Sequence, residues 1–201
     1  YFNKQFRGPI EKQADVEKSQ LLSQRIAPFM LRRTKKEVVS ELPEKTVIIQ
    51  TLELERDQRN LYESIRLVME KKLRELFAKK GVSSSHIEFL DALLKLRQAC
   101  CDPRLVKLEQ AQQVKDNAKM TWLIQNLPEM IEEGRKILIF SQFTGMLALI
   151  EDELKRLTIS YSKLTGQTRD RQTQIDAFQE GDNSVFLISL KAGGTGLNLT
   201  A

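Results

Sequence analysis

The feature that most constrains the fold is a regular alternation of strand-like and helix-like segments from about residue 117 onward. Three short segments, at 136–142, 159–164 and 184–190, have the length and composition of strands, and the first reads as a buried one. Stretches with apolar residues at helical spacing precede the first of these segments and separate the others. Such alternation is typical of a parallel sheet covered by helices, so we predict an α/β fold for this part of the chain.

The middle of the chain is predicted to form a helical hairpin. A stripe of apolar residues between positions 61 and 77 predicts a long amphipathic helix that ends near Gly81. A second helix is predicted to stop before Pro103, and its apolar face comprises Ile87, Leu90, Leu94 and Cys101. The short connection between the two helices leads us to expect that they run antiparallel.

The beginning of the chain is less regular in sequence. Residues 1–18 are polar, and we expect them to be irregular. Apolar residues in 19–33 recur at helical spacing until Pro28 interrupts them, which predicts a short helix followed by a basic connecting segment. The β-branched segment 46–54 then predicts a strand.

Positive charge is concentrated in the first part of the chain. The net charge is +5, but residues 1–120 carry 24 Lys and Arg against 17 Asp and Glu, whereas residues 121–201 carry 8 against 10. The densest stretch, 25–36, has five basic residues and no acidic one. Such a run can neutralise nucleic-acid phosphates, although a solvated helix face gives the same pattern.

Composition excludes several classes of protein. With 41% hydrophobic and 29% charged residues, the chain is neither low-complexity nor unfolded, and no apolar run approaches the ~20 residues that cross a bilayer. Because it begins with Tyr and shows no secretion signal, we expect a fragment. The adjacent Cys100 and Cys101, with His86 as the single histidine, supply neither a disulfide nor a zinc site, so we predict no metal ligands and a reducing compartment.

Candidate binding residues lie where the predicted strands end. In an open parallel sheet, ligands bind beyond the carboxyl ends of the strands. Those ends read 141–144, 164–168 and 191–196, and all three are polar or rich in glycine, which lets backbone N–H groups approach a phosphate. Simple tight turns remain an alternative. No phosphate loop, dinucleotide motif or Ser/His/Asp set is present, so no catalytic residue is assigned.

Six segments of the chain, taken in order, resemble one known family. They are RIAPFMLRRTKKEVVSELPEKT, LRQACCDPRL, KILIFSQFTGML, YSKLTGQT, RQTQIDAF and VFLISLKAGGTGLNLTA. Together they closely resemble the second motor lobe of Swi/Snf-type DNA-dependent ATPases of helicase superfamily two. The resemblance covers nearly the whole chain and is greatest to bacterial members.

The resemblance implies a role for individual residues. FSQF corresponds to the family's fourth motif, the TG pair to its contact with the phosphates of the tracking strand, and ISLKAGGTGLNL to its fifth motif. The residues implied to face DNA are Gln142, Thr165, Gly166, Ser189, Lys191 and Gly193. Gly196 and Asn198 are implied to approach the nucleotide, and Leu190 stands where some relatives have Thr.

The resemblance also implies a division of the chain. Residues 1–45 would be a basic connector, including Arg32 and Arg33, from a missing first RecA-like lobe. Residues 46–116 would be the strand and the helical insertion of the family, and 117–201 a truncated RecA-like helicase C-terminal lobe. The fold class implied is therefore α/β, a RecA-like parallel sheet flanked by helices, with a helical hairpin inserted.

The implied function is that of a fragment of an ATP-dependent translocase on double-stranded DNA. The full-length protein would use ATP and Mg, while the phosphate loop, the Asp-Glu box and the arginine motif are absent from these residues, so the fragment should not hydrolyse ATP alone. Implied partners are duplex DNA, the first lobe, and RNA polymerase or another DNA-bound complex, with no membrane. The expected location is cytoplasmic in a bacterium and nuclear in a eukaryote.

Two other functions remain open on the residues alone. The basic helical hairpin could form a non-enzymatic module that binds protein or nucleic acid. Alternatively, the glycines at 193–196 could bind a nucleotide cofactor in an α/β enzyme.

Overall fold

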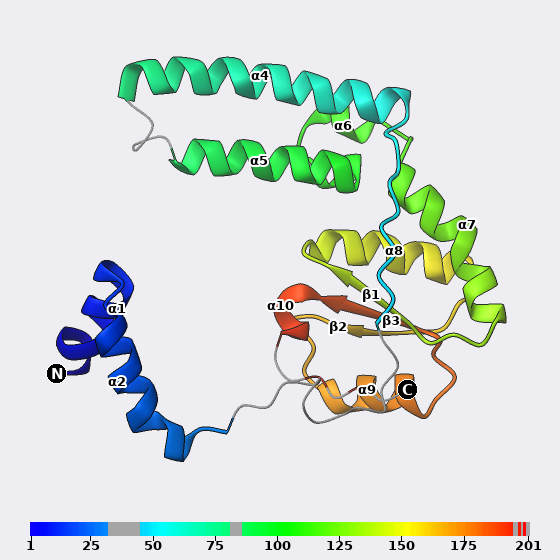
Figure 1. The fold of residues 1–201 in the computed structure, drawn as a ribbon. Coiled ribbons are helices and arrows are strands. Elements are labelled where there is room, and N and C mark those ends of the chain that lie inside the picture. Colours follow the sequence, from blue (N-terminus) through cyan, green and yellow to red (C-terminus); the bar gives the residue numbers. More distant parts are fainter. Residues whose placement is uncertain (32–44, 81–85, 195–196, 198, 200–201) are drawn as a thin grey trace. The chain divides into compact units, whose positions relative to one another are not determined.

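The computed structural model describes residues 1–31, 45–80, 86–194, 197 and 199 (Figure 1). The chain divides into two compact units, Tyr1–Ile49 and Gln50–Ala201.

The first unit is helical almost from its first residue. Its elements are η1 (Asn3–Arg7), α1 (Gly8–Gln13), α2 (Val16–Ile26) and η2 (Ala27–Phe29). The expectation that residues 1–18 are irregular was wrong, because local caps organise them: Ala14 takes a left-handed conformation with φ of 50°, and the Asp15 carboxylate accepts the Lys18 N–H at 2.9 Å. As predicted, the α-helix ends before Pro28.

The strand predicted over 46–54 does not form. Residues 45–55 have no regular secondary structure, and Val47, Ile48 and Ile49 are 69–86% exposed. A β-branched segment becomes a strand only where another strand accepts its backbone hydrogen bonds, and none pairs with it among the described residues. The basic residues Arg32 and Arg33 lie outside the described residues.

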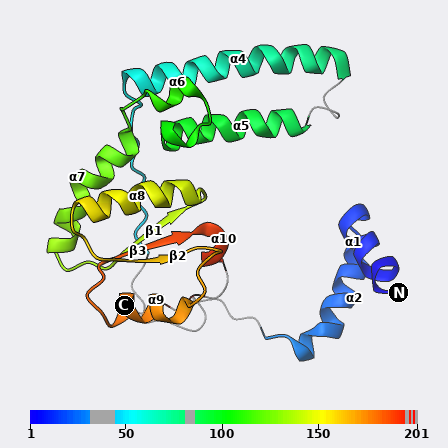
Figure 2. The same cartoon turned by 180° about the vertical axis from the view of Figure 1, so that it is seen from behind.

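The second unit begins with the predicted antiparallel hairpin. Helices α4 (Arg56–Lys80) and α5 (His86–Cys101) lie side by side and run in opposite directions (Figures 1 and 2). The packing face predicted for α5 was wrong, since Ile87, Leu90 and Leu94 are 81, 63 and 40% exposed. The buried positions of α5 are instead Ala92 and Ala99, whose small side chains let the two helices approach closely.

Two buried polar side chains fasten the hairpin to the following helix, α7 (Ala118–Glu132). Gln58 is fully buried; its Nε2 donates to the Ala99 carbonyl at 2.9 Å, and its Oε1 accepts the Ala118 N–H at 3.0 Å. These are backbone groups at the end of α5 and the start of α7, which have no partner within their own helices. The buried Asp102 carboxylate accepts a hydrogen bond from Asn117, the residue that caps α7. The connection also contains η4 (Pro103–Leu105) and α6 (Glu109–Gln112).

Three parallel strands form the sheet in the order β1-β3-β2, so that the last strand in sequence lies at the centre. Their register pairs Ser141 with Ser189 and Leu164 with Ile188. This confirms the predicted α/β arrangement and all three predicted strands, within two residues at each end. The elements are β1 (Ile137–Ser141), α8 (Thr144–Arg156), β2 (Tyr161–Leu164), α9 (Arg171–Gln179), β3 (Val185–Ser189) and α10 (Leu190–Gly193).

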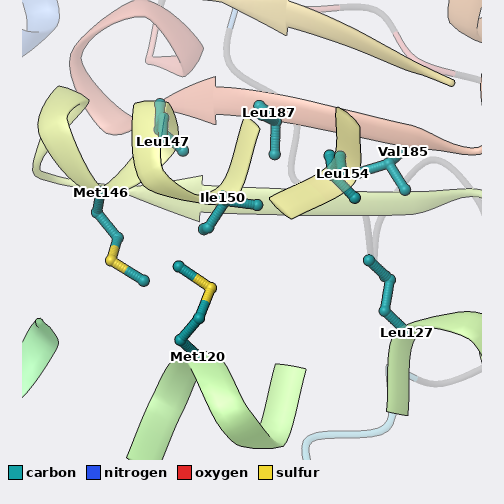
Figure 3. Close-up of a cluster of buried hydrophobic side chains, with 8 residues drawn as sticks. All are labelled: Met120, Leu127, Met146, Leu147, Ile150, Leu154, Val185 and Leu187. Carbon is teal, nitrogen blue, oxygen red and sulfur yellow. The ribbon is translucent and has the colours of Figure 1, made fainter. Parts of the chain in front are cut away.

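Helices cover both faces of this sheet. On one face, α7 and α8 enclose a cluster that includes Val185 and Leu187 of β3 (Figure 3). On the other face, Phe186 and Ile188 of β3 pack with Phe178 of α9. The central strand therefore buries side chains on both faces, which accounts for its continuous apolar sequence.

An ion-pair network joins α8 to β2. The Glu151 carboxylate accepts hydrogen bonds from Tyr161 Oη at 2.7 Å, from Lys155 and from Lys163. Partial burial pulls the pKa of Glu151 upward, but the hydrogen bonds from Lys163, Tyr161 and Lys155 outweigh this effect and lower the pKa to about 2.

The buried Gln58 gives a first prediction. Replacing it in Gln58→Ala should lower the free energy of unfolding by about 2 kcal/mol or more, because two buried backbone groups lose their partner. Gln125→Ala, at an exposed helical position of α7, is the matched control and should change it by less than about 0.5 kcal/mol. Chemical denaturation measures both, and equal effects would contradict the proposed role of Gln58.

A second prediction concerns pH. The folded-state pKa of Glu151 lies below its ordinary value of 4.5, so its contribution to stability is present above pH 4.5 and is lost as the pH falls toward 2. The wild type should be more stable than Glu151→Gln at pH 6, and the difference should shrink steadily between pH 4.5 and 2. Denaturation curves across this range test it. A difference that is independent of pH would show that the network contributes nothing through ionisation.

Candidate nucleic-acid interface

The carboxyl ends of the three strands lie at one edge of the sheet, because the strands are parallel and in register. The residues that follow them are therefore neighbours in space although they are far apart in sequence. All six residues predicted to face DNA lie at this edge, either at the end of β3 or within four residues after a strand.

The turn after β1 exposes Gln142. Ser141 is buried, and its Oγ accepts the Phe143 N–H at 3.1 Å, which holds the chain in position before α8 begins. The Gln142 side chain is exposed, and its Oε1 accepts a hydrogen bond from Nη2 of Arg97 in α5. The predicted site residue is thus in contact with the helical hairpin, a contact that the sequence did not indicate.

The turn after β2 is closed by its own hydroxyl groups. The Thr165 N–H donates to Thr168 Oγ1 at 2.9 Å, and the Gln167 N–H donates to Thr165 Oγ1 at 3.3 Å. Gly166 is exposed at the tip of this turn, and a Cβ built there would meet no atom within 4 Å. Packing within the described fold does not require glycine at this position, and the space above it is open to a ligand.

The turn after β3 is a short helix, α10, rather than a loop. Ser189 is buried, and its Oγ accepts the Ala192 N–H at 3.3 Å as the cap of this helix. Lys191 is exposed on α10. At Gly193 a Cβ would lie 3.1 Å from Ile188 and 3.2 Å from the Phe140 ring, so this glycine has a packing function.

Sequence reasoning missed Arg171, which lies at the start of α9. Its Nη2 donates to the Ala192 carbonyl at 2.7 Å and so holds α10 against the sheet. The local sequence offers one clue, since Asp170 caps α9 and Arg171 directly follows it at the carboxyl edge of the sheet.

The nucleotide side of the predicted site is not described. Gly196 and Asn198 lie outside the described residues, whereas Leu197 and Leu199 pack against the cluster under α9. Among the described residues, no group of three or more His, Cys, Asp and Glu side chains could hold a metal ion, and none of the described helices is long and apolar enough to cross a membrane.

The two cysteines are free thiols in helix α5. Both are partly buried, and this burial raises their pKa above the ordinary value. Cys101 packs against the apolar cluster between α8 and the sheet. Neutral thiols in such a position act as small apolar side chains.

The parallel sheet, its covering helices and its polar carboxyl edge define an α/β lobe with a candidate ligand-binding edge. Residues 118–201 match the family described as helicase conserved C-terminal domain, and residues 1–105 match the SNF2-related domain. The chain belongs to the SNF2-related family.

Solved structures show the same fold. The SWI2/SNF2 ATPase core domain of Sulfolobus solfataricus aligns with 99% of this chain and 42% of its own, at 31% identity and a TM-score of 0.62. The same core in complex with double-stranded DNA aligns with 94% of this chain and 40% of its own, at 30% identity and a TM-score of 0.58. The RecA-like fold class predicted from the sequence is thereby confirmed.

Curated relatives are much longer than this chain. An uncharacterized ATP-dependent helicase of Mycoplasma genitalium is 34% identical over 98% of the chain, which spans 19% of the relative. A chromodomain-helicase-DNA-binding protein 1-like of Danio rerio is 35% identical over 90% of the chain, which spans 18% of that relative. The chain thus spans about a fifth of the length of these relatives.

The two glycines at this edge give a third prediction. Gly193→Ala should lower the free energy of unfolding by about 1 kcal/mol, because its Cβ forces Ile188 or Phe140 to move. Gly166→Ala, where the space is open, should change it by less than about 0.5 kcal/mol. Thermal denaturation of both variants measures the difference. A larger loss at Gly166 than at Gly193 would mean that the turns are packed differently.

Proposed function

We propose that the protein containing these residues is an ATP-dependent translocase on double-stranded DNA, and that the carboxyl edge of this sheet forms part of its grip on the DNA backbone. The observation that carries the proposal is that exposed Gln142, Gly166 and Lys191 follow three different strands whose carboxyl ends lie at one edge of the sheet. Family membership supports a motor over a non-enzymatic binding module.

Each DNA-facing residue has a role in this proposal. Lys191 neutralises a phosphate, and Gln142 donates a hydrogen bond to another. The Thr165-Gly166 turn lets the DNA backbone approach the protein backbone, because no Cβ occupies the space above Gly166. Ser189 and Gly193 act by holding α10, through the cap and through close packing respectively.

Contacts of this kind carry little information about base sequence. Binding should therefore be largely independent of sequence and should weaken with salt as counterions return to the phosphates. Both properties suit an enzyme that moves along DNA rather than one that reads a site.

The nucleotide side of the proposal rests on Gly196 and Asn198, which lie three and five residues after the end of α10 in sequence. ATP with Mg, when bound, would supply the phosphoryl transfer that drives closure and opening of two lobes. Lys191 and Gly196 are five residues apart, so the phosphate grip and the nucleotide side are close together in the sequence. The first lobe must bring the phosphate loop and the Asp-Glu box.

The proposed context follows from the same assignment. Residues 1–45 would connect to the first lobe, and residues 46–116 would be the helical insertion of the family. The remodelled target would be RNA polymerase or another complex on DNA, in the cytoplasm of a bacterium or the nucleus of a eukaryote.

A fourth prediction, which tests the proposed function, concerns the salt dependence of DNA binding. Lys191→Ala should weaken binding to a random-sequence duplex and should reduce the slope of log K against log salt by roughly 0.9, the value for one lost phosphate contact. Arg135→Ala is the matched control, because Arg135 is exposed two residues before β1, at the opposite edge of the sheet, and its loss should leave the slope nearly unchanged.

The full-length protein provides the decisive readout. Its ATP hydrolysis should be stimulated by double-stranded DNA, and Lys191→Ala should reduce this stimulation while Arg135→Ala does not. Hydrolysis that does not respond to duplex DNA would contradict the proposed function.

A further inference from the structure

The helical hairpin contacts the carboxyl edge of the sheet through a hydrogen bond between Arg97 and Gln142. Arg97 lies in the last part of α5 and Gln142 directly after β1, 45 residues later in the chain. Nη2 of Arg97 donates to Oε1 of Gln142 although both side chains are exposed. The pair lies at a groove of about 510 Å³ between the hairpin and the sheet, to which Lys119 and Leu190 also contribute.

Buried side chains hold the backbone on both sides of this contact. Two positions after Arg97, the Ala99 carbonyl is held by the buried Gln58 side chain, and Ala99 itself is fully buried. On the other side, buried Ser141 holds the turn that carries Gln142 through its bond from the Phe143 N–H. The hydrogen bond therefore joins two positions that are already in place, so little further ordering of the backbone is needed to form it.

The direction of the hydrogen bond determines what Gln142 offers to a ligand. A glutamine amide has an oxygen that only accepts and an NH2 group that only donates. With the oxygen occupied by Arg97, the NH2 group is the free end of the side chain. A phosphate oxygen requires a donor, so the Arg97 bond selects the end of the amide that suits the DNA backbone.

We propose that Arg97 is a positioning residue for DNA binding, which fixes the Gln142 amide with its NH2 group directed to a backbone phosphate. This inference rests on the proposed function, because it assigns a second residue to the same grip. It also gives the helical hairpin an indirect role at the DNA-facing edge, because α5 orients a residue of the lobe without contacting the phosphate itself.

Positioning and direct phosphate binding differ in what they predict for salt. If Arg97 bound a phosphate, its removal would reduce the salt slope by roughly 0.9. If it acts through the neutral Gln142, its removal weakens binding while the slope changes much less. Lys119 provides the matched control, since it is an exposed cation that lines the same groove, on α7, and has no hydrogen bond to Gln142 among those found in the described residues.

The experiment is a double-mutant cycle on the affinity of the chain for a random-sequence duplex. Arg97→Ala and Gln142→Ala should each weaken binding roughly 3- to 10-fold, as expected for one hydrogen bond, and the double variant should be no weaker than the worse single variant. Lys119→Ala and Gln142→Ala should instead combine additively. Additive losses for Arg97 and Gln142, or a slope reduced by about 0.9 in Arg97→Ala, would overturn the inference.

A second measurement does not depend on DNA. In the free chain, nuclear magnetic resonance of the Gln142 side-chain NH2 group should show a single ordered environment that Arg97→Ala shifts and makes more mobile, while the melting temperature stays unchanged. An unchanged Gln142 signal would overturn the inference. If no variant binds DNA and the wild type does not either, the proposed function fails instead, and the two failures are thereby distinguished.

Discussion

The proposed DNA-facing edge depends on the burial of β3 between two parallel neighbours. Val185, Phe186, Leu187 and Ile188 have no exposed surface, and burying each such side chain stabilises the fold by about 1.5–3 kcal/mol. Because β3 hydrogen-bonds to β1 on one side and β2 on the other, it sets the register of both. Three segments separated by more than twenty residues in the chain therefore end at one edge, where their turns can act on a single ligand.

Polar side chains link the helical hairpin to the start of α7 and to this edge. Buried Gln58 and Asp102 satisfy backbone groups and a capping residue at the start of α7, and such buried groups are costly to leave without partners. The orientation of the hairpin is thereby specified by directional bonds. Arg97 extends the same linkage to the surface, where it contacts Gln142. The hairpin can in this way influence a site formed by residues of the sheet.

The sequence predicted the sheet well because β1 and β3 are almost entirely apolar and helices with apolar residues at helical spacing alternate with the strands, which are local signals of burial. It failed at 46–54, where the β-branched residues have no partner strand among the described residues, and on α5, where the buried positions are Ala92 and Ala99 rather than Ile87, Leu90 and Leu94. It located the glycine-rich turns but could not separate Gly193, which lies close to Ile188 and Phe140, from Gly166, which lies open. That difference depends on neighbours distant in sequence.

The central claim is that three strand ends form one surface for duplex DNA, and hydrogen–deuterium exchange of the chain with and without a random-sequence duplex tests it most directly. DNA should reduce exchange together in the turns at 142–144, 165–168 and 190–194. The opposite edge of the sheet, at 134–136, 158–160 and 181–184, should be unaffected and serves as the internal reference. Protection at this opposite edge, or at only one of the three turns, would contradict the claim.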